Sequence, residues 1–107
     1  MERLKRRADF LAAATGSKVP AGPFVLQARE RDDRGPARVG FTVTKKTGNA
    51  VERNRIRRRL RELVRRSNDT MQAGHDYVLI GRRVALNAPF DRMTDEFTRA
   101  LKRAHRK

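Results

Sequence analysis

One stretch, residues 50–66, constrains the fold more than any other. Asn49 precedes it and Glu52 follows three positions later, a spacing typical of a helix N-cap with a capping box. At about 100° per residue, the apolar residues of the stretch share one narrow stripe. They are Ile56, Leu60, Leu63 and Val64. We therefore expect a helix from Ala50 to about Ser67, with this stripe packed on the core.

The opposite side of the predicted helix is strongly basic. Asn54, Arg58, Arg61 and Arg65 share the far face, and Arg55, Arg57, Arg59 and Arg66 flank it. Between Lys45 and Arg66 there are ten cationic and two acidic residues, a net +8 of the chain's +15. A solvated basic face is the plain alternative, but such faces usually interleave Glu with Lys. We therefore interpret this face as a surface for a polyanion, with nucleic acid the first candidate and an anionic membrane surface the second.

Length and composition bound the rest. The chain has 107 residues, six aromatic side chains and no cysteine, which indicates one small domain over 1–107 without disulfides or thiolate metal sites. Its apolar runs are far shorter than the roughly 20 residues of a membrane span, and the start MERLKRRADF has no apolar signal core. We expect a soluble cytoplasmic protein that does not bind membranes, whose basic residues 1–7 are flexible.

Periodicity predicts the elements before this helix. Phe10 lies in a short helix that ends near Gly16. Residues 23–30 alternate as a strand, and the next strand runs from Arg38 to about Lys46 after a turn at 31–36. We expect the two strands to pair as a hairpin. The second face of the later strand, with Thr42, Thr44 and Lys46, has room for an extended ligand, although alternation alone favours an ordinary solvated face.

Two elements are predicted after the basic helix. Residues 76–83 form a short apolar strand, and Pro89 precedes a last helix. The apolar residues of that helix recur three or four apart and indicate one packed stripe. They are Phe90, Met93, Phe97, Leu101 and Ala104.

The chain shows no residues for catalysis of its own. His75 and His105 lie far apart in the sequence and are interpreted as surface or RNA-contacting residues, and the acidic pairs at 32–33 and 95–96 have no third ligand nearby. No glycine-rich phosphate-binding pattern is present. We therefore predict no catalytic residue, no metal ligand, no organic cofactor and no small-molecule substrate.

The run from Lys45 to Glu62, KKTGNAVERNRIRRRLRE, closely resembles the signature of the bacterial ribonuclease P protein subunit, with Arg53-Asn54-Arg55 as its core. The order of the flanking elements is similar along nearly the whole chain. The resemblance implies an α+β fold: a compact two-layer sandwich with a small mixed sheet, about three helices and a left-handed β-α-β crossover. It also implies a partner, a large catalytic RNA. With Mg²⁺, that RNA removes the 5′ leader of precursor tRNA while the protein binds the leader, so Mg²⁺ is expected mainly in the RNA.

The resemblance also assigns candidate site residues. It carries over Arg53, Asn54, Arg57, Arg58 and Arg61 as RNA contacts, and the basic residues Lys45, Lys46, Arg55 and Arg65 complete the predicted RNA-binding set. The leader cleft, between the first helix and the sheet, takes Phe10, Gln27, Thr42, Thr44 and Lys46, with Phe10 as a platform for base stacking. Relatives often carry further aromatic residues where this chain has Ala14 and Gln27. We therefore expect leader binding that is weaker than in such relatives and more sensitive to salt.

Two other functions fit the composition. A structural RNA-binding protein, such as a small ribosomal protein, would be equally basic, and the signature run favours the ribonuclease P subunit over it. An autonomous nuclease would need acid–base or metal-binding residues that the sequence does not offer.

Overall fold

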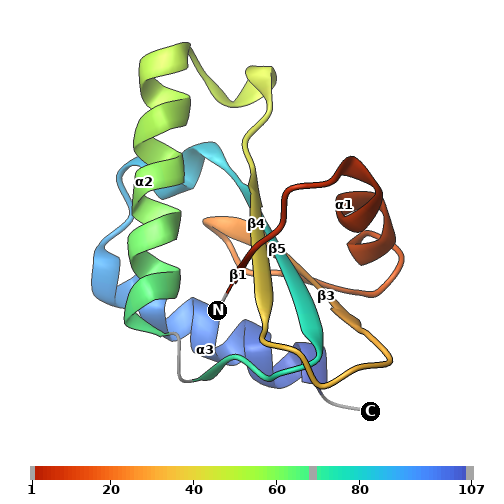
Figure 1. The fold of residues 1–107 in the computed structure, drawn as a ribbon. Coiled ribbons are helices and arrows are strands. Elements are labelled where there is room, and N and C mark those ends of the chain that lie inside the picture. The colour runs from red at the N-terminus through yellow and green to blue at the C-terminus, as the bar shows by residue number, and fades with distance from the viewer. Residues whose placement is uncertain (1, 68–69, 106–107) are drawn as a thin grey trace.

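The computed structural model describes residues 2–67 and 70–105 (Figure 1). The strands are β1 (Glu2–Arg3), β2 (Ser17–Pro20), β3 (Phe24–Glu30), β4 (Arg38–Thr42) and β5 (His75–Gly81). The helices are α1 (Arg7–Ala13), α2 (Ala50–Arg66) and α3 (Phe90–His105), with the short 3-10 turns η1 (Lys45–Thr47) and η3 (Arg83–Leu86). None of the described helices combines the length and the apolar character that crossing a membrane requires.

The strands form one mixed sheet in the order β1-β4-β5-β3-β2. β4 runs parallel to both β1 and β5, and β3 runs antiparallel to β5 and β2. The predicted hairpin between residues 23–30 and 38–46 is therefore wrong, because β5 lies between β3 and β4. Tyr77, Val78 and Leu79 are all buried, so β5 is covered on both faces and takes the central position. The β-α-β crossover implied by the resemblance is the unit β4–α2–β5.

The predicted strand from Arg38 to Lys46 is also too long. β4 ends at Thr42, and the chain then leaves the sheet through η1 to reach the start of α2. Two short edge strands were not predicted. β1 has only two residues and lies in the stretch expected to be flexible, while β2, flanked by Gly16 and ending at Pro20, resembles a loop in its sequence.

Helices cover both faces of the sheet, unequally. Figure 1 shows α2 and α3 on one side and α1 on the other. The larger core lies under α2 and α3 and includes both predicted apolar stripes, so these stripes are confirmed. A smaller cluster of Leu4, Ala13 and Val78 lies under α1, with Phe10 and Ile80 packed against it. The α+β class with three helices and a mixed sheet is therefore confirmed.

A buried carboxylate joins the ends of three strands. Asp76 is fully buried, and its two oxygens accept hydrogen bonds from Arg31 at 2.5 Å and from Arg38 at 2.8 and 2.7 Å. Burial raises the pKa of Asp76, but the hydrogen bonds from Arg38 and Arg31 outweigh this and leave its pKa below the usual value. Arg38 also lies 3.5 Å from Asp9 of α1, so the same cluster holds α1 to the sheet. No local sequence pattern predicts this cluster, because its members are distant along the chain.

Candidate nucleic-acid interface

The start of α2 is fixed by the predicted capping box. The Glu52 backbone N–H donates to Asn49 Oδ1 at 2.9 Å, and the Asn49 backbone N–H donates to Glu52 Oε1 at 3.0 Å. Arg83 of η3 also donates to Glu52 at 2.7 Å. The hydrogen bonds from Arg83 and from the Asn49 backbone lower the pKa of Glu52. The helix therefore begins at a defined residue and presents its basic face in a fixed orientation.

Part of that face has no partner within the described residues. Arg55, Arg58 and Arg61 are exposed and make no hydrogen bond or ion pair there. Asn54, Arg57, Arg58 and Arg61 line a hollow of about 330 Å³. Arg53 is half-buried, and its Nε is buried without an acceptor among the described residues. We call Asn54, Arg55, Arg57, Arg58 and Arg61 the α2 basic face.

Other arginines of α2 are bound within the fold. Arg59 donates to the carbonyl oxygens of Leu86, at 2.8 Å, and of Ala88. Arg66 lies over the Phe90 ring, 4.5 Å from its centroid. Arg65 and Arg66 both pair with Glu62, and the hydrogen bonds from Arg65 and then Arg66 lower the pKa of Glu62 to about 2. Arg65, a predicted RNA contact, remains 73% exposed beside this pair.

A second hollow connects the α2 basic face with α1. It has a volume of about 240 Å³, and Arg57 and Arg61 form one of its walls. Its other lining residues are Arg3, Leu4, Phe10, Val39, Gly40 and Phe41. Arg57 and Arg61 line both hollows, so the two hollows lie next to each other, and we call the hollow beside α1 the α1–α2 groove.

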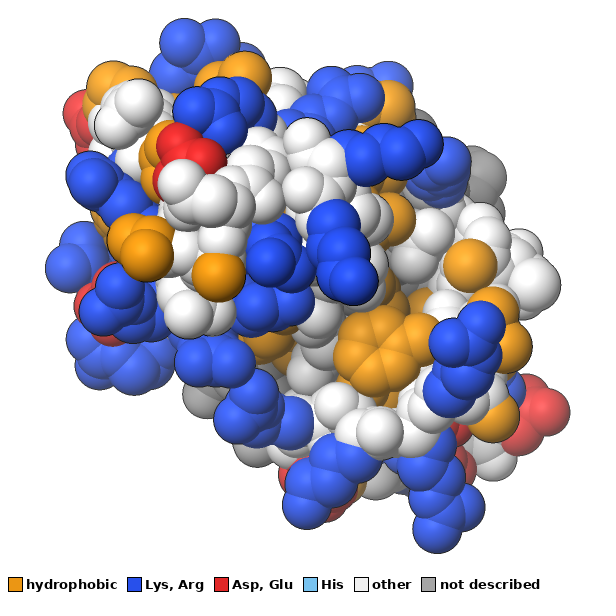
Figure 2. Space-filling view, turned by 90° about the horizontal axis from the view of Figure 1, so that it is seen from above, with side chains coloured by type: hydrophobic (Ala, Val, Ile, Leu, Met, Phe, Trp, Pro, Cys, Tyr) orange, Lys and Arg blue, Asp and Glu red, His pale blue; other side chains and the backbone are white. Residues whose placement is uncertain are grey.

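Phe10 depends on a glycine for its place in this groove. A Cβ atom on Gly40 would lie 2.4 Å from the Phe10 ring, which is far closer than such atoms approach. The absence of a side chain at Gly40 therefore lets the ring lie directly on β4. Figure 2, a view from above Figure 1, shows Lys and Arg side chains gathered on this face around a hollow with apolar side chains.

The residues predicted for a leader cleft lie in three different environments. Phe10 lines the α1–α2 groove, and Thr42 is half-buried on the same face of β4 as Gly40. Thr44 and Lys46 are exposed, but they lie beyond the end of β4, so Lys46 does not extend the strand face as predicted. Gln27 is only 8% exposed and pairs in register with Val78, which packs under α1. Its amide has little surface to offer a ligand.

Two residues of the groove were not among the predicted site residues. Arg3 belongs to β1, the edge strand that the sequence did not reveal. Phe41 alternates with Val39 and Val43, a pattern that predicts a position on the core-facing side of the strand. It is only half-buried, because β1 is two residues long and leaves the edge of β4 partly open. Together these residues give the groove a second aromatic ring and a third guanidinium group.

The groove has the chemistry of a single-stranded nucleic-acid site. Guanidinium groups pair with phosphate oxygens, and aromatic rings stack on bases of any sequence. Within the described ranges 2–67 and 70–105, no three His, Cys, Asp or Glu residues are grouped so that they could hold a metal ion. His75 and His105, which are distant in the sequence, lie together with ring centroids 4.7 Å apart, because the end of α3 packs beside the start of β5.

The chain is similar to known proteins along most of its length. The model of the family Ribonuclease P matches residues 1–105. The chain is 53% identical over 104 residues to the ribonuclease P protein component of Gluconacetobacter diazotrophicus, covering 95% of this chain and 90% of that protein. It is 49% identical over 107 residues to that of Bartonella quintana, covering 94% and 80%. Among solved structures, the RNase P protein of Staphylococcus aureus is similar with a TM-score of 0.81 and 30% identity, over 98% of this chain and 96% of that one. The chain belongs to the ribonuclease P protein family.

Proposed function

We propose that this chain is the protein subunit of a ribonuclease P ribonucleoprotein and supports removal of the 5′ leader from precursor tRNA. The α2 basic face binds the catalytic RNA, and the α1–α2 groove binds the single-stranded leader. The observation that carries this proposal is the sharing of Arg57 and Arg61 between the two hollows. A leader bound in the groove would lie directly beside the catalytic RNA bound on α2. Cleavage of the substrate by that RNA requires the leader and the catalytic RNA to be adjacent in this way.

The residues of the α2 basic face and of the α1–α2 groove suit two different RNA partners. Arg55 and Arg58 are exposed on the outer side of α2 and suit the phosphates of a large structured RNA. Arg57 and Arg61 face the groove as well and suit the leader phosphates, while Phe10 offers its ring to a leader base. The positive charge of both surfaces lowers the repulsion between two polyanions that must approach each other.

The bond cleavage itself is assigned to the RNA. The described residues offer no grouped metal ligands, and their positive charge suits RNA binding better than acid–base work. Mg²⁺ held by the catalytic RNA would activate the attacking water and stabilise the leaving oxygen. The protein raises the affinity for the substrate and the local stability of the complex.

A leader-length series tests the groove. Precursor tRNAs with leaders of increasing length are titrated into the holoenzyme made with a bacterial ribonuclease P RNA. We expect the affinity to rise with each leader nucleotide until the groove is filled, and Arg61→Ala together with Phe10→Ala to remove most of this gain. Lys18→Ala, an exposed cation on β2, is the matched control and should keep it. Equal affinity for all leader lengths in the unaltered holoenzyme would disprove the leader site.

A further inference from the structure

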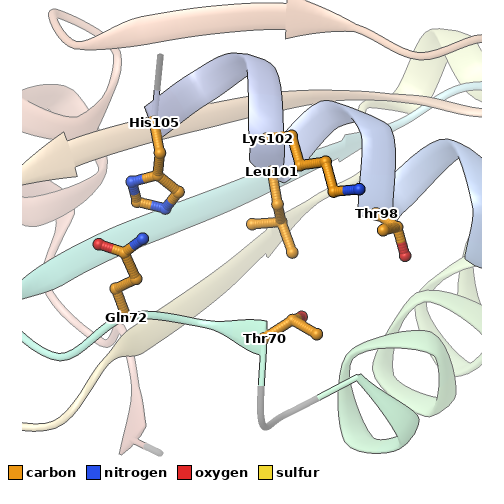
Figure 3. Close-up of a pocket in the computed structure, with 6 residues that line it drawn as sticks. All are labelled: Thr70, Gln72, Thr98, Leu101, Lys102 and His105. Atoms are coloured by element: carbon orange, nitrogen blue, oxygen red, sulfur yellow. The ribbon is translucent and has the colours of Figure 1, made fainter. Parts of the chain in front are cut away.

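A separate hollow lies between α3 and the segment that leads into β5. Its volume is about 490 Å³, within the range of about 300 to 1,000 Å³ that is typical of ligand pockets. Figure 3 shows its lining: Thr98, Leu101, Lys102 and His105 come from α3, and Thr70 and Gln72 lie across from them. None of these six residues belongs to the α1–α2 groove.

The two threonines can only accept hydrogen bonds from a ligand. Thr70 Oγ1 donates its proton to the Ser67 carbonyl at 2.6 Å, and Thr98 Oγ1 donates to the Thr94 carbonyl at 3.0 Å. Their remaining lone pairs would repel an anion placed between them. The Gln72 side-chain amide adds both a donor and an acceptor, and the Lys102 ammonium adds donors at an exposed position. The hollow therefore suits a neutral polar group inside and a negative charge only beside Lys102.

His105 has a defined orientation in the wall of this hollow. The fully buried Tyr77 hydroxyl accepts from the Gln72 backbone N–H at 3.1 Å and forms a second hydrogen bond with His105 Nε2 at 2.7 Å, in which either group can be the donor. Burial, and then the neighbouring His75, lower the pKa of His105, while Glu30 acts in the opposite direction. The hydrogen bond to Tyr77 orients the imidazole, which presents a flat ring in the wall of the hollow.

We propose that this hollow binds one unpaired nucleobase of an RNA, with the base against Leu101 and His105, its polar edge at Gln72 and the threonine oxygens, and the adjoining phosphate on Lys102. A nucleobase is flat and carries donors and acceptors on its edge, which matches the lining. Arg99 and Arg103 are exposed on the same helix and extend the positive charge for neighbouring phosphates. This inference rests on the proposed function, because RNA is the partner named there.

The test uses the full chain labelled with ¹⁵N and titrated with the four nucleoside 5′-monophosphates, followed by NMR. We expect at least one of them to shift the Gln72 side-chain amide and the His105 resonances saturably, while ribose 5-phosphate at the same concentrations does not. Gln72→Ala retains the backbone N–H that binds Tyr77, and it should weaken this binding about fivefold, as should Lys102→Ala. Arg92→Ala, at an exposed cation near the start of the same helix and outside the hollow, is the matched control.

Two results would overturn the site. One is equal shifts with ribose 5-phosphate, which would indicate binding by charge alone. The other is the absence of shifts at Gln72 and His105. The Arg58→Ala, Arg61→Ala double variant separates this proposal from the previous one, because it should lose affinity for the catalytic RNA and keep the nucleotide shifts. Unchanged assembly of this variant with the catalytic RNA would count against the α2 basic face as an RNA-binding surface. It would not bear on the proposal for the hollow.

Discussion

At the scale of single residues, Gly40 and Phe10 form the contact on which the groove depends. The ring of Phe10 occupies the space where a side chain at Gly40 would be. The ring is thereby held against β4 and packs on Leu4, Ala13 and Val78, so it would not have to be ordered when the proposed leader base binds.

The first prediction concerns this contact. Gly40→Ala should lower the free energy of unfolding by about 1 to 3 kcal/mol, because the new methyl group overlaps the ring. In a Phe10→Ala background, the same substitution should cost much less, since the ring is gone. Urea denaturation of the four proteins measures both costs. An equal cost of Gly40→Ala in the two backgrounds would show that the ring does not lie on the glycine.

The second prediction concerns Asp76. Its pKa in the folded protein is below the usual value, so its contribution to stability is complete above the unfolded pKa of about 3.9 and is lost as the pH falls through the folded value. Asp76→Asn should cost about 3 kcal/mol at pH 7, because two arginines lose their buried partner.

Denaturation midpoints between pH 7 and pH 3 measure this effect. The unaltered protein should lose more stability over that range than the Asp76→Asn variant does. Asp33→Asn, at a side chain that is 54% exposed and also bound to Arg31, is the control and should cost less. Parallel pH curves for the unaltered protein and the Asp76→Asn variant would contradict the assignment.

At the scale of elements, α2 has two kinds of arginine. Periodicity alone places Arg58, Arg61 and Arg59 on or beside one basic face. The structure separates them, because Arg59 is bonded to two carbonyl groups at the end of η3, whereas Arg58 and Arg61 have no partner within the described residues.

The third prediction follows from this difference. Arg58→Ala with Arg61→Ala should weaken assembly with the catalytic RNA and reduce the salt dependence of log K by about one unit per lost phosphate contact. Arg59→Ala should instead lower the melting temperature and leave the salt dependence unchanged. Filter binding over a range of salt concentrations, together with thermal denaturation, distinguishes the two. A loss of salt dependence in the Arg59→Ala variant would contradict the division.

The elements that could be predicted are those specified by local sequence. The cap at Asn49, the stripe of α2 and the stripe of α3 are all local patterns, and all three were correct. Strand pairing depends on contacts between distant residues, so the hairpin of residues 23–30 and 38–46 was wrong and the edge strands β1 and β2 were missed. For the same reason, the sequence could not show that Arg3 and Phe41 line the groove or that His75 and His105 meet.

At the scale of the whole molecule, the sheet separates two surfaces. Its α1 side and the open edge beside α2 form the α1–α2 groove, while the proposed nucleobase site lies along α3, which packs on the opposite face from α1. Of the chain's net charge of +15, +8 lies between Lys45 and Arg66, the segment that includes α2. An approaching RNA is therefore attracted first to that side. This arrangement supports the proposal that the subunit binds a catalytic RNA and its substrate while the RNA supplies the reactive groups.

The most direct test of this account is cleavage of precursor tRNA at low Mg²⁺ with a bacterial ribonuclease P RNA. The RNA alone, the protein alone and the two together are compared under the same conditions. We predict cleavage at the mature 5′ end only when both are present. Absence of stimulation by the folded protein with a matched RNA would contradict the account and leave a structural RNA-binding role. Cleavage by the protein alone would contradict the assignment of the chemistry to the RNA.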